Sequence, residues 1–322
     1  MKRRFLSRLR LVGGSLRTFL SNRLAVAGAV LIILYGLAGA VYPFLLGTVW
    51  PETLYDPVFG FDIELMHPSP PGAGHLLGTD SLGRDVLSQL LGSTGPTWIM
   101  AVTAALTTAA VAVVIGALGA VFRGWVDGVL ARVSDSFLLL PAPIFMLVIG
   151  ASERSEQIGP FSFGLTYGLI VGFGAGAIVL RAQALKIAAS PFVDSARVAG
   201  VGRWRVMTRH VIPHLLPLGA LYMMLSVIGA IVADGFASFF GQTGTRVNWG
   251  MMVYYGIEFP DPLTGAPAWN VLLPPSIALS LFAAAFYLVS VGLREVADPR
   301  YRAARGRLGD PTADWRVDEG TE

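Results

Sequence analysis

The sequence contains no cysteine, and only 14% of its 322 residues are charged. Without cysteine there is no disulfide, thiolate metal site, iron–sulfur cluster or cysteine nucleophile. A soluble domain carries about 25% charged residues, whereas this chain combines few charges with 54% apolar residues. Walker, Gly-x-Ser-x-Gly and Rossmann glycine patterns are also missing. The chain is therefore expected to be a membrane protein that is not itself an enzyme and binds no cofactor.

Six long runs lack any charged residue, and each has 17 to 37 residues. A helix needs about 20 apolar residues, with a range of about 17 to 25, to cross the hydrocarbon core of a bilayer. The runs therefore predict an all-α integral membrane protein with six transmembrane helices. They are residues 24–51, 86–122, 136–152, 157–180, 210–233 and 262–293.

Segments with many basic residues alternate along the chain with segments that have only one. The arm up to Arg23 has seven, the segment between the second and third runs has two, and residues 181–209 and the tail from Arg294 have six each. The other three segments contain one arginine each. Because short basic loops stay in the cytoplasm, both termini are expected to be cytoplasmic. Ala38-Gly39-Ala40 resembles a signal-peptide cleavage site, but the apolar stretch continues beyond it and favours a retained helix.

Two spans have unusual features. The third run is short and contains Pro141 and Pro143, so it must either recruit Val129, Leu130 and Val133 or stay buried against its neighbours. The fifth helix is expected to continue past Asp234, an acid that needs a partner or water near the external membrane face.

The external segment, residues 47–96, ends in a patterned stretch. Thr79 or Asp80 is a suitable cap for a helix with Leu82 and Val86 on its apolar stripe. We therefore expect an amphipathic helix near the membrane surface before the second crossing.

A cytoplasmic segment between the fourth and fifth runs predicts two short helices. Pro191 suits a first helical turn, Asp194 favours the positive helix end, and Gly200 suits its stop. A second helix begins after Gly202 and is expected to break near Pro213. A short helix of this kind suits either a groove on a soluble partner or the surface of an anionic membrane.

Histidines supply no strong metal site. His210 and His214 have i, i+4 spacing, but Pro213 lies between them and no glutamate follows His210. We interpret them as cytoplasmic, partly solvated side chains. His67 and His75 fit an ordinary structured loop.

The segment around Asp194 resembles the EAA loop of binding-protein-dependent ABC importer permeases. Asp194-Ser195-Ala196 stands for Glu-Ala-Ala, Gly200 for the motif glycine and Pro213 for the final proline, with the spacing intact. The resemblance implies an ATPase-coupling segment. Its residues are Asp194, Ser195, Ala196, Ala199, Gly200, Arg203 and Pro213.

Other motifs narrow the resemblance to the C-type permease of the dipeptide, oligopeptide and nickel group. His75-Leu76-Leu77-Gly78-Thr79-Asp80-Ser81-Leu82-Gly83-Arg84-Asp85 is similar to an external signature of that group. Motifs at residues 22–28, 124–127, 248–252 and 292–300 follow in the family's order. The signature positions are His75, Gly78, Thr79, Asp80, Gly83, Arg84 and Asp85.

This resemblance implies a type I ABC importer permease in the cell membrane of a prokaryote. A B-type permease would pair with the chain, two ATPase subunits would bind ATP and Mg, and an extracytoplasmic solute-binding protein would deliver di- or oligopeptides. Membrane lipid surrounds it, and no nucleic acid is expected. Alternatives are an importer of nickel or oligosaccharides on the same scaffold, and a self-contained channel or secondary carrier.

Departures from the family pattern concern the pathway. The acid of the EAA motif is shortened at Asp194, Ile178 stands where the family often has arginine, and Asp234 stands where it usually has glutamate. Asp234 and Gln242 are candidate pathway or gate residues.

The segments expected along the chain are a basic arm (1–23), a first membrane helix (24–46), an external segment (47–96), a five-helix core (97–293) with the coupling segment (186–213), and a cytoplasmic tail (294–322).

Overall fold

The computed structural model describes residues 19–72, 74–150, 159–239, 247–260, 265 and 268–297. These residues form helices and connecting turns with no β-strand, apart from one isolated bridge between Thr79 and Asp85. The α-helices are α2 (Arg23–Thr48), α3 (Glu52–Tyr55), α4 (Val86–Phe122), α5 (Trp125–Leu138), α6 (Ala142–Gly150), α7 (Pro160–Val171), α8 (Ala177–Ala188), α9 (Pro191–Val198), α10 (Arg203–Val206), α11 (Ile212–Phe239), α12 (Trp249–Glu258) and α13 (Trp269–Ala297). Two π-helical turns, η2 (Gly172–Gly176) and η3 (Met207–Val211), join neighbouring helices.

Five described helices are long and apolar enough to cross a membrane. They are Arg23–Thr48, Val86–Phe122, Pro160–Ala188, Arg203–Ala237 and Trp269–Leu293. The sixth expected crossing corresponds to α5 and α6, which bend by 73° at their junction. Helix α5 begins at Trp125 and so includes Val129, Leu130 and Val133, which is the first of the two alternatives expected for the short third run.

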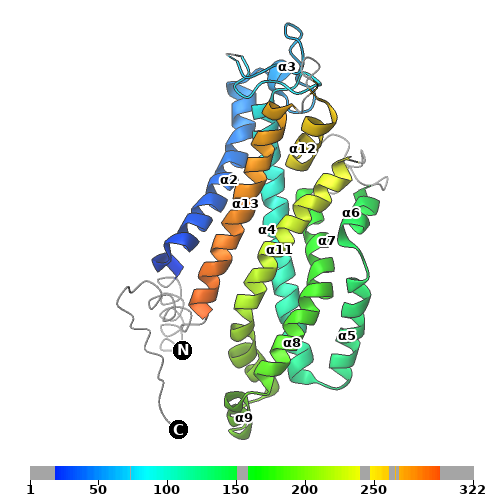
Figure 1. The fold of residues 1–322 in the computed structure, drawn as a ribbon. Helices are drawn as coiled ribbons and strands as arrows, with labels where there is room; N and C mark the ends of the chain where they lie inside the picture. The colour runs from blue at the N-terminus through cyan, green and yellow to red at the C-terminus, as the bar shows by residue number, and fades with distance from the viewer. Residues whose placement is uncertain are drawn as a thin grey trace, which may run out of the picture.

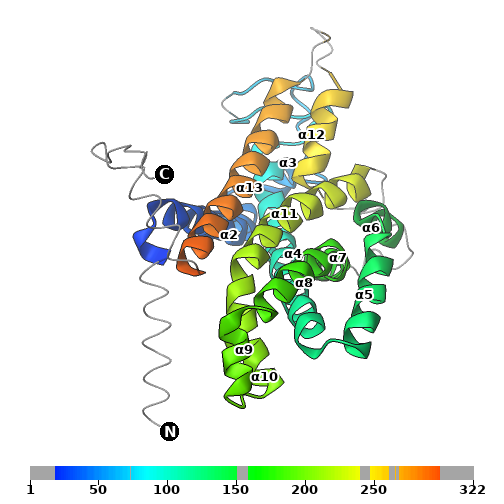
Figure 2. The same ribbon diagram turned by 60° about the horizontal axis from the view of Figure 1, so that its bottom comes forward.

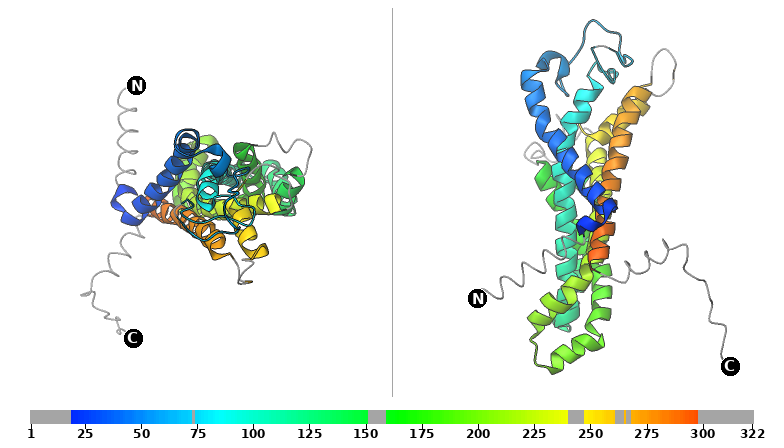
Figure 3. Two further views of the ribbon diagram at one scale, coloured as in Figure 1. Left: turned by 90° about the horizontal axis from the view of Figure 1, so that it is seen from above. Right: turned by 90° about the vertical axis from the view of Figure 1, so that its left-hand side faces the viewer.

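Helix α4 is the central element of the bundle. It packs against α2 on one side, α7 and α8 on another, and α11 on a third. Figure 1 shows α2 and α13 side by side on one flank, with α5 and α6 on the opposite flank. The external segment and α12 lie at one end, and α9 lies at the other. Figure 3 shows the same long axis from the side, with the α9 region extending beyond the other helices.

Glycines allow α7 to approach α4 closely. A Cβ atom on Gly164 would lie 2.3 Å from the carbonyl oxygen of Met100, and one on Gly168 would lie 2.7 Å from Thr107 Cβ. A Cβ on Gly172 would lie 2.9 Å from Val111 Cβ. These three glycines follow each other at intervals of four, so they share one helix face. Backbone proximity of this kind is how membrane helices pack.

The expected surface helix before the second crossing is wrong. Helix α4 begins at Val86 and continues without interruption to Phe122, and its cap is Asp85, whose carboxylate accepts from the backbone N–H of Ser88 at 2.6 Å. Asp80 instead closes a turn by accepting from the N–H groups of Leu82 and Arg84. Gly83 has φ +80, which ends any right-handed helix at that point.

The expected break near Pro213 is also wrong. The helix continues through this proline from Arg203 to Ala237, and the irregularity precedes it as η3. Pro213 has no backbone N–H to donate, and the wider π-helical turn before it accommodates the absence of that hydrogen bond. The fifth span also continues past Asp234, because α11 ends at Phe239.

Candidate functional site

Helix α9 is short and lies at the end of the bundle, beside α10, as Figure 2 shows. Val193, on its inner face, is 0% exposed and packs in a cluster with Ala117 and Leu180 of the long helices. The ring of Phe192 stacks on that of His214 at a centroid distance of 5.4 Å. Helix α9 is therefore attached to both of the spans that it connects.

A glycine ends α9 in a defined geometry. Gly200 has φ +78, its N–H donates to the carbonyl oxygen of Arg197 at 2.9 Å, and the N–H of Val201 donates to Ala196 at 3.1 Å. This pair of bonds is the Schellman arrangement, which satisfies the last carbonyls of a helix. The predicted start at Pro191 and stop at Gly200 are thus confirmed.

The outer face of α9 is exposed, and most of its side chains are small. Val198 is 90% exposed, Asp194, Ser195 and Ala199 are exposed, and Ala196 is half-buried. Asp194 accepts from Arg197 at 3.1 Å. Arg203 begins α10 and Pro213 lies in the first turn of α11. An exposed valine beside small side chains is suited to a shallow apolar groove on another protein.

The external signature forms a buried polar cluster at the opposite end. His75 is 2% exposed; its Nδ1 lies 2.8 Å from Asp85 Oδ2 and its Nε2 lies 3.1 Å from Asp62 Oδ2. Because Asp85 also caps α4, the imidazole connects the loop acid Asp62 to the start of the central helix. The N–H of Glu64 and then His75 hold the pKa of Asp62 below its ordinary value of 3.8.

A second ion pair lies beside it. Arg84 Nε donates to Asp80 Oδ2 at 2.8 Å, and Gln89 Nε2 donates to the same oxygen at 3.0 Å. The guanidinium lies over the ring of Tyr255 on α12, 5.0 Å from its centroid, in a cation–π contact. The pair therefore links the turn to α4 and α12.

Asn270 at the start of α13 completes the cluster. Its side-chain amide donates to the carbonyl oxygens of Ser69, Leu77 and Thr79 at 3.1 to 3.4 Å. Gly78 has φ +77, and a Cβ there would lie 2.7 Å from Asn270 Nδ2. The signature is thus joined to α4, α12 and α13. Asp62, Tyr255 and Asn270 were missed by sequence reasoning, since no local spacing connects them to residues 75–85.

The pathway candidates are only partly described. Asp234 on α11 accepts from Asn248 Nδ2 at 2.7 Å, and Asn248 caps α12, so the acid joins α11 to α12. Gln242 lies outside the described residues.

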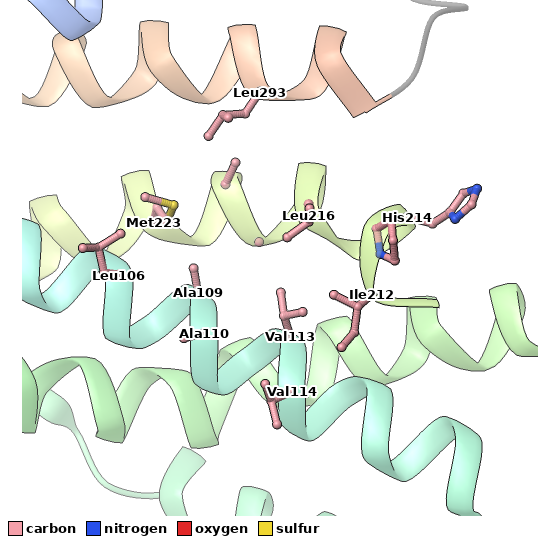
Figure 4. Close-up of a pocket in the computed structure, with 13 residues that line it drawn as sticks. Leu106, Ala109, Ala110, Val113, Val114, Ile212, His214, Leu216, Met223 and Leu293 are labelled. Carbon is pink, nitrogen blue, oxygen red and sulfur yellow. The ribbon is translucent and has the colours of Figure 1, made fainter. Parts of the chain in front are cut away.

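Figure 4 shows an apolar groove of about 580 Å³ between α4, α11 and α13. Leu106, Val113, Leu216 and Met223 line it, and His214 is its only titratable side chain among the described residues. Such a lining offers no donor or acceptor pattern to select a polar solute.

Two irregular segments pack against each other, η2 and the end of α5. Turn η2 contains Gly174, with non-helical angles of φ −76 and ψ −112. A Cβ on Gly174 would lie 3.2 Å from the backbone nitrogen of Leu138, one residue before the α5–α6 junction. The rings of Phe137 and Phe173 stack at 5.2 Å. Kinks of two neighbouring spans therefore coincide.

Comparison with known proteins yields matches along nearly the whole chain. A family model described as "Binding-protein-dependent transport system inner membrane component" matches residues 112–303. The "Putative peptide transport system permease protein" of Brucella suis is 34% identical over 74% of this chain and 77% of that protein. The "Oligopeptide transport system permease protein OppC" of Mycobacterium tuberculosis is 32% identical over 94% of this chain and 98% of its own. The "Glutathione transport system permease protein GsiD" of Pectobacterium atrosepticum is 25% identical over 89% of this chain and 90% of that protein.

Proposed function

Since the chain belongs to the binding-protein-dependent transport system inner membrane components, we propose that it is one permease subunit of a peptide importer and is driven through α9. Relatives named for peptides, oligopeptides and glutathione support a peptide cargo over nickel or oligosaccharides. The observation that carries the proposal is α9 itself, with a 0% exposed Val193 on one face and a 90% exposed Val198 on the other.

The α9 end of the bundle is cytoplasmic in this proposal. The basic arm before Arg23, the six basic residues of 181–209 and the tail after Arg294 then all lie inside, in accord with the positive-inside rule. The acidic segment with His75 and Asp85 faces the solute-binding protein. A B-type permease forms the other half of the pathway, and two ATPase subunits bind ATP and Mg below.

Closure of the ATPases moves α9, and the bundle responds as a lever. Only two residues separate the end of α8 at Ala188 from Pro191, the first residue of α9, so a displacement of α9 is transmitted to α8. The irregular turn η2 and the α5–α6 junction at Leu139 lie side by side above α8 and absorb the rotation. Such gating of one bundle against another gives alternating access.

The decisive experiment compares two aspartate substitutions in proteoliposomes that contain all subunits and the binding protein. Gly200→Asp places a side chain at φ +78 and weakens the end of α9 by about 1–3 kcal/mol, so peptide uptake should fall while membrane insertion is retained. Gly202→Asp introduces the same charge two residues away, where φ is −61 and aspartate is a favourable helix cap. That control should import peptide at nearly the original rate.

A substitution on the docking face tests the same proposal independently. Ala196→Arg adds bulk and charge where α9 is expected to meet the ATPase, and it should reduce both ATPase retention and uptake. Normal uptake by Ala196→Arg and Gly200→Asp, or uptake by this subunit alone, contradicts the proposal.

A further inference from the structure

A cavity of about 310 Å³ lies between the end of α4 and the connection from α9 to α10. Its polar lining is three arginines from separate elements: Arg123, Arg197 and Arg203. The other lining residues are Val121, Phe122, Val201 and Val206, and none of the described residues that line it is acidic. The cavity, called here the basic pocket, therefore offers guanidinium donors beside an apolar wall.

Most of this charge has no counter-ion in the described part of the chain. Arg197 donates to Asp194 at 3.1 Å, but Asp194 does not line the pocket. Arg203 and Arg123 make no ion pair within 4.0 Å of another described side chain, although the carboxylate of Asp127, already paired with Arg181, is close enough to interact electrostatically with Arg123. Guanidinium groups bind carboxylate and phosphate oxygens in paired, charge-assisted hydrogen bonds. An anionic group thus fits the pocket.

The backbone at Arg123 is unusual. Its φ is +37, and it is the one non-glycine residue with positive φ among those the structure describes. Gly124 follows with φ +65. This turn ends α4 and begins α5, and it carries Arg123 to the pocket. A side chain in that region is disfavoured sterically, so the conformation is maintained by its surroundings.

We propose that the basic pocket is a second docking point for the ATPase and receives a carboxylate side chain of that subunit. The inference rests on the proposed function, because Arg197 and Arg203 belong to the α9–α10 segment that the ATPase would contact. A carboxylate in the pocket would also bind Arg123, and would thereby connect the ATPase directly to α4 and α5. An anionic lipid headgroup has comparable chemistry, but α9 and α10 lie at the far tip of the molecule (Figure 2).

Zero-length cross-linking tests the contact. The chain has two lysines, Lys2 and Lys186, and both are first replaced by arginine. Arg123→Lys is then introduced, and the assembled complex is treated with a carbodiimide, which joins an amine to a contacting carboxylate. An amide bond to an aspartate or glutamate of the ATPase is expected. Arg132→Lys, on α5 and outside the pocket, is the matched control and should not cross-link.

Affinity measurements give a second readout. Arg123→Gln should weaken ATPase binding about tenfold or more and reduce its salt dependence, whereas Arg132→Gln should leave both unchanged. Binding is measured in detergent and in nanodiscs with and without anionic lipid. A loss confined to anionic nanodiscs assigns the pocket to lipid and overturns the proposal, as does no cross-link together with unchanged affinity.

Ala196→Arg separates this inference from its premise. If Ala196→Arg prevents ATPase binding and Arg123→Gln does not, the basic pocket is no docking point and the proposed function stands. If neither substitution changes ATPase binding, the proposed function itself fails.

Discussion

Asp127 and Arg181 form a two-point ion pair between α5 and α8. Arg181 Nε donates to Asp127 Oδ1 at 2.5 Å, and Nη2 donates to Oδ2 at 2.6 Å. Both side chains are partly exposed. The pair lies on the α9 side of η2 and the α5–α6 junction, so it joins the two helix segments that the proposed lever must move together.

We predict that Asp127→Asn uncouples this lever. It leaves the guanidinium of Arg181 without its anionic partner, at a cost of about 1–3 kcal/mol. ATP hydrolysis by the reconstituted complex should continue, while peptide uptake per ATP should fall. The exchanged pair Asp127→Arg with Arg181→Asp should recover part of the uptake. Equal uptake per ATP in Asp127→Asn and the original protein would contradict the proposal that this pair makes α5 and α8 move together.

A second prediction concerns the flexibility of η2. Gly174→Ala favours a regular α-helix by about 1 kcal/mol and places a Cβ 3.2 Å from Leu138 N. Uptake should fall, and spin labels on α8 and α7 should report a smaller distance change when ATP is added. Gly128→Ala is the control, because nothing lies within 4 Å of a Cβ at Gly128 on α5. An equal loss of uptake in Gly128→Ala would contradict the interpretation of η2 as a hinge.

Helix spans and the bounds of α9 were predictable because their signals are local. Uncharged length determines a span, and Pro191 and Gly200 mark the ends of α9 by their backbone chemistry alone. The start of α4 was not predictable, since Asp80 and Asp85 are equally good caps. Both oxygens of Asp80 are engaged by the turn and by the side chains of Arg84 and Gln89, whereas Asp85 keeps Oδ1 for the N–H of Ser88 while its Oδ2 faces His75. That choice depends on the packed cluster rather than on spacing.

The same limit applies to long-range partners. Asn270 contacts Ser69 and Thr79 of the loop before α4 across 201 and 191 residues. Arg123, at the end of α4, lines the basic pocket together with Arg203, the first residue of α10. Neither relationship has a periodic or spacing signal, so only the folded chain reveals it.

A pH prediction follows from Asp62. Its folded-state pKa is lowered from 3.8, first by the N–H of Glu64 and then by His75. A depressed carboxyl pKa contributes stability that is present above the unfolded pKa and is lost as the pH falls through the folded value. The loop should therefore become more accessible to an acid protease as the pH falls below 3.8. Asp62→Asn should be more accessible already at pH 5, with a weaker pH dependence; an identical profile would contradict the assignment.

The last prediction concerns the contact between α2 and α4, where Gly39 faces Gly95. A Cβ on Gly39 would lie 2.4 Å from Gly95 Cα, so Gly39→Leu must push the helices apart. Overpacking of this kind costs about 1–3 kcal/mol, and the thermal midpoint of the subunit in nanodiscs should fall. Gly47→Leu adds the same side chain at a position on α2 with nothing within 4 Å and should leave the midpoint nearly unchanged. If both variants lose equal stability, a general effect of the added leucine rather than the close crossing accounts for the loss, and α2 is not held to α4 through this glycine pair.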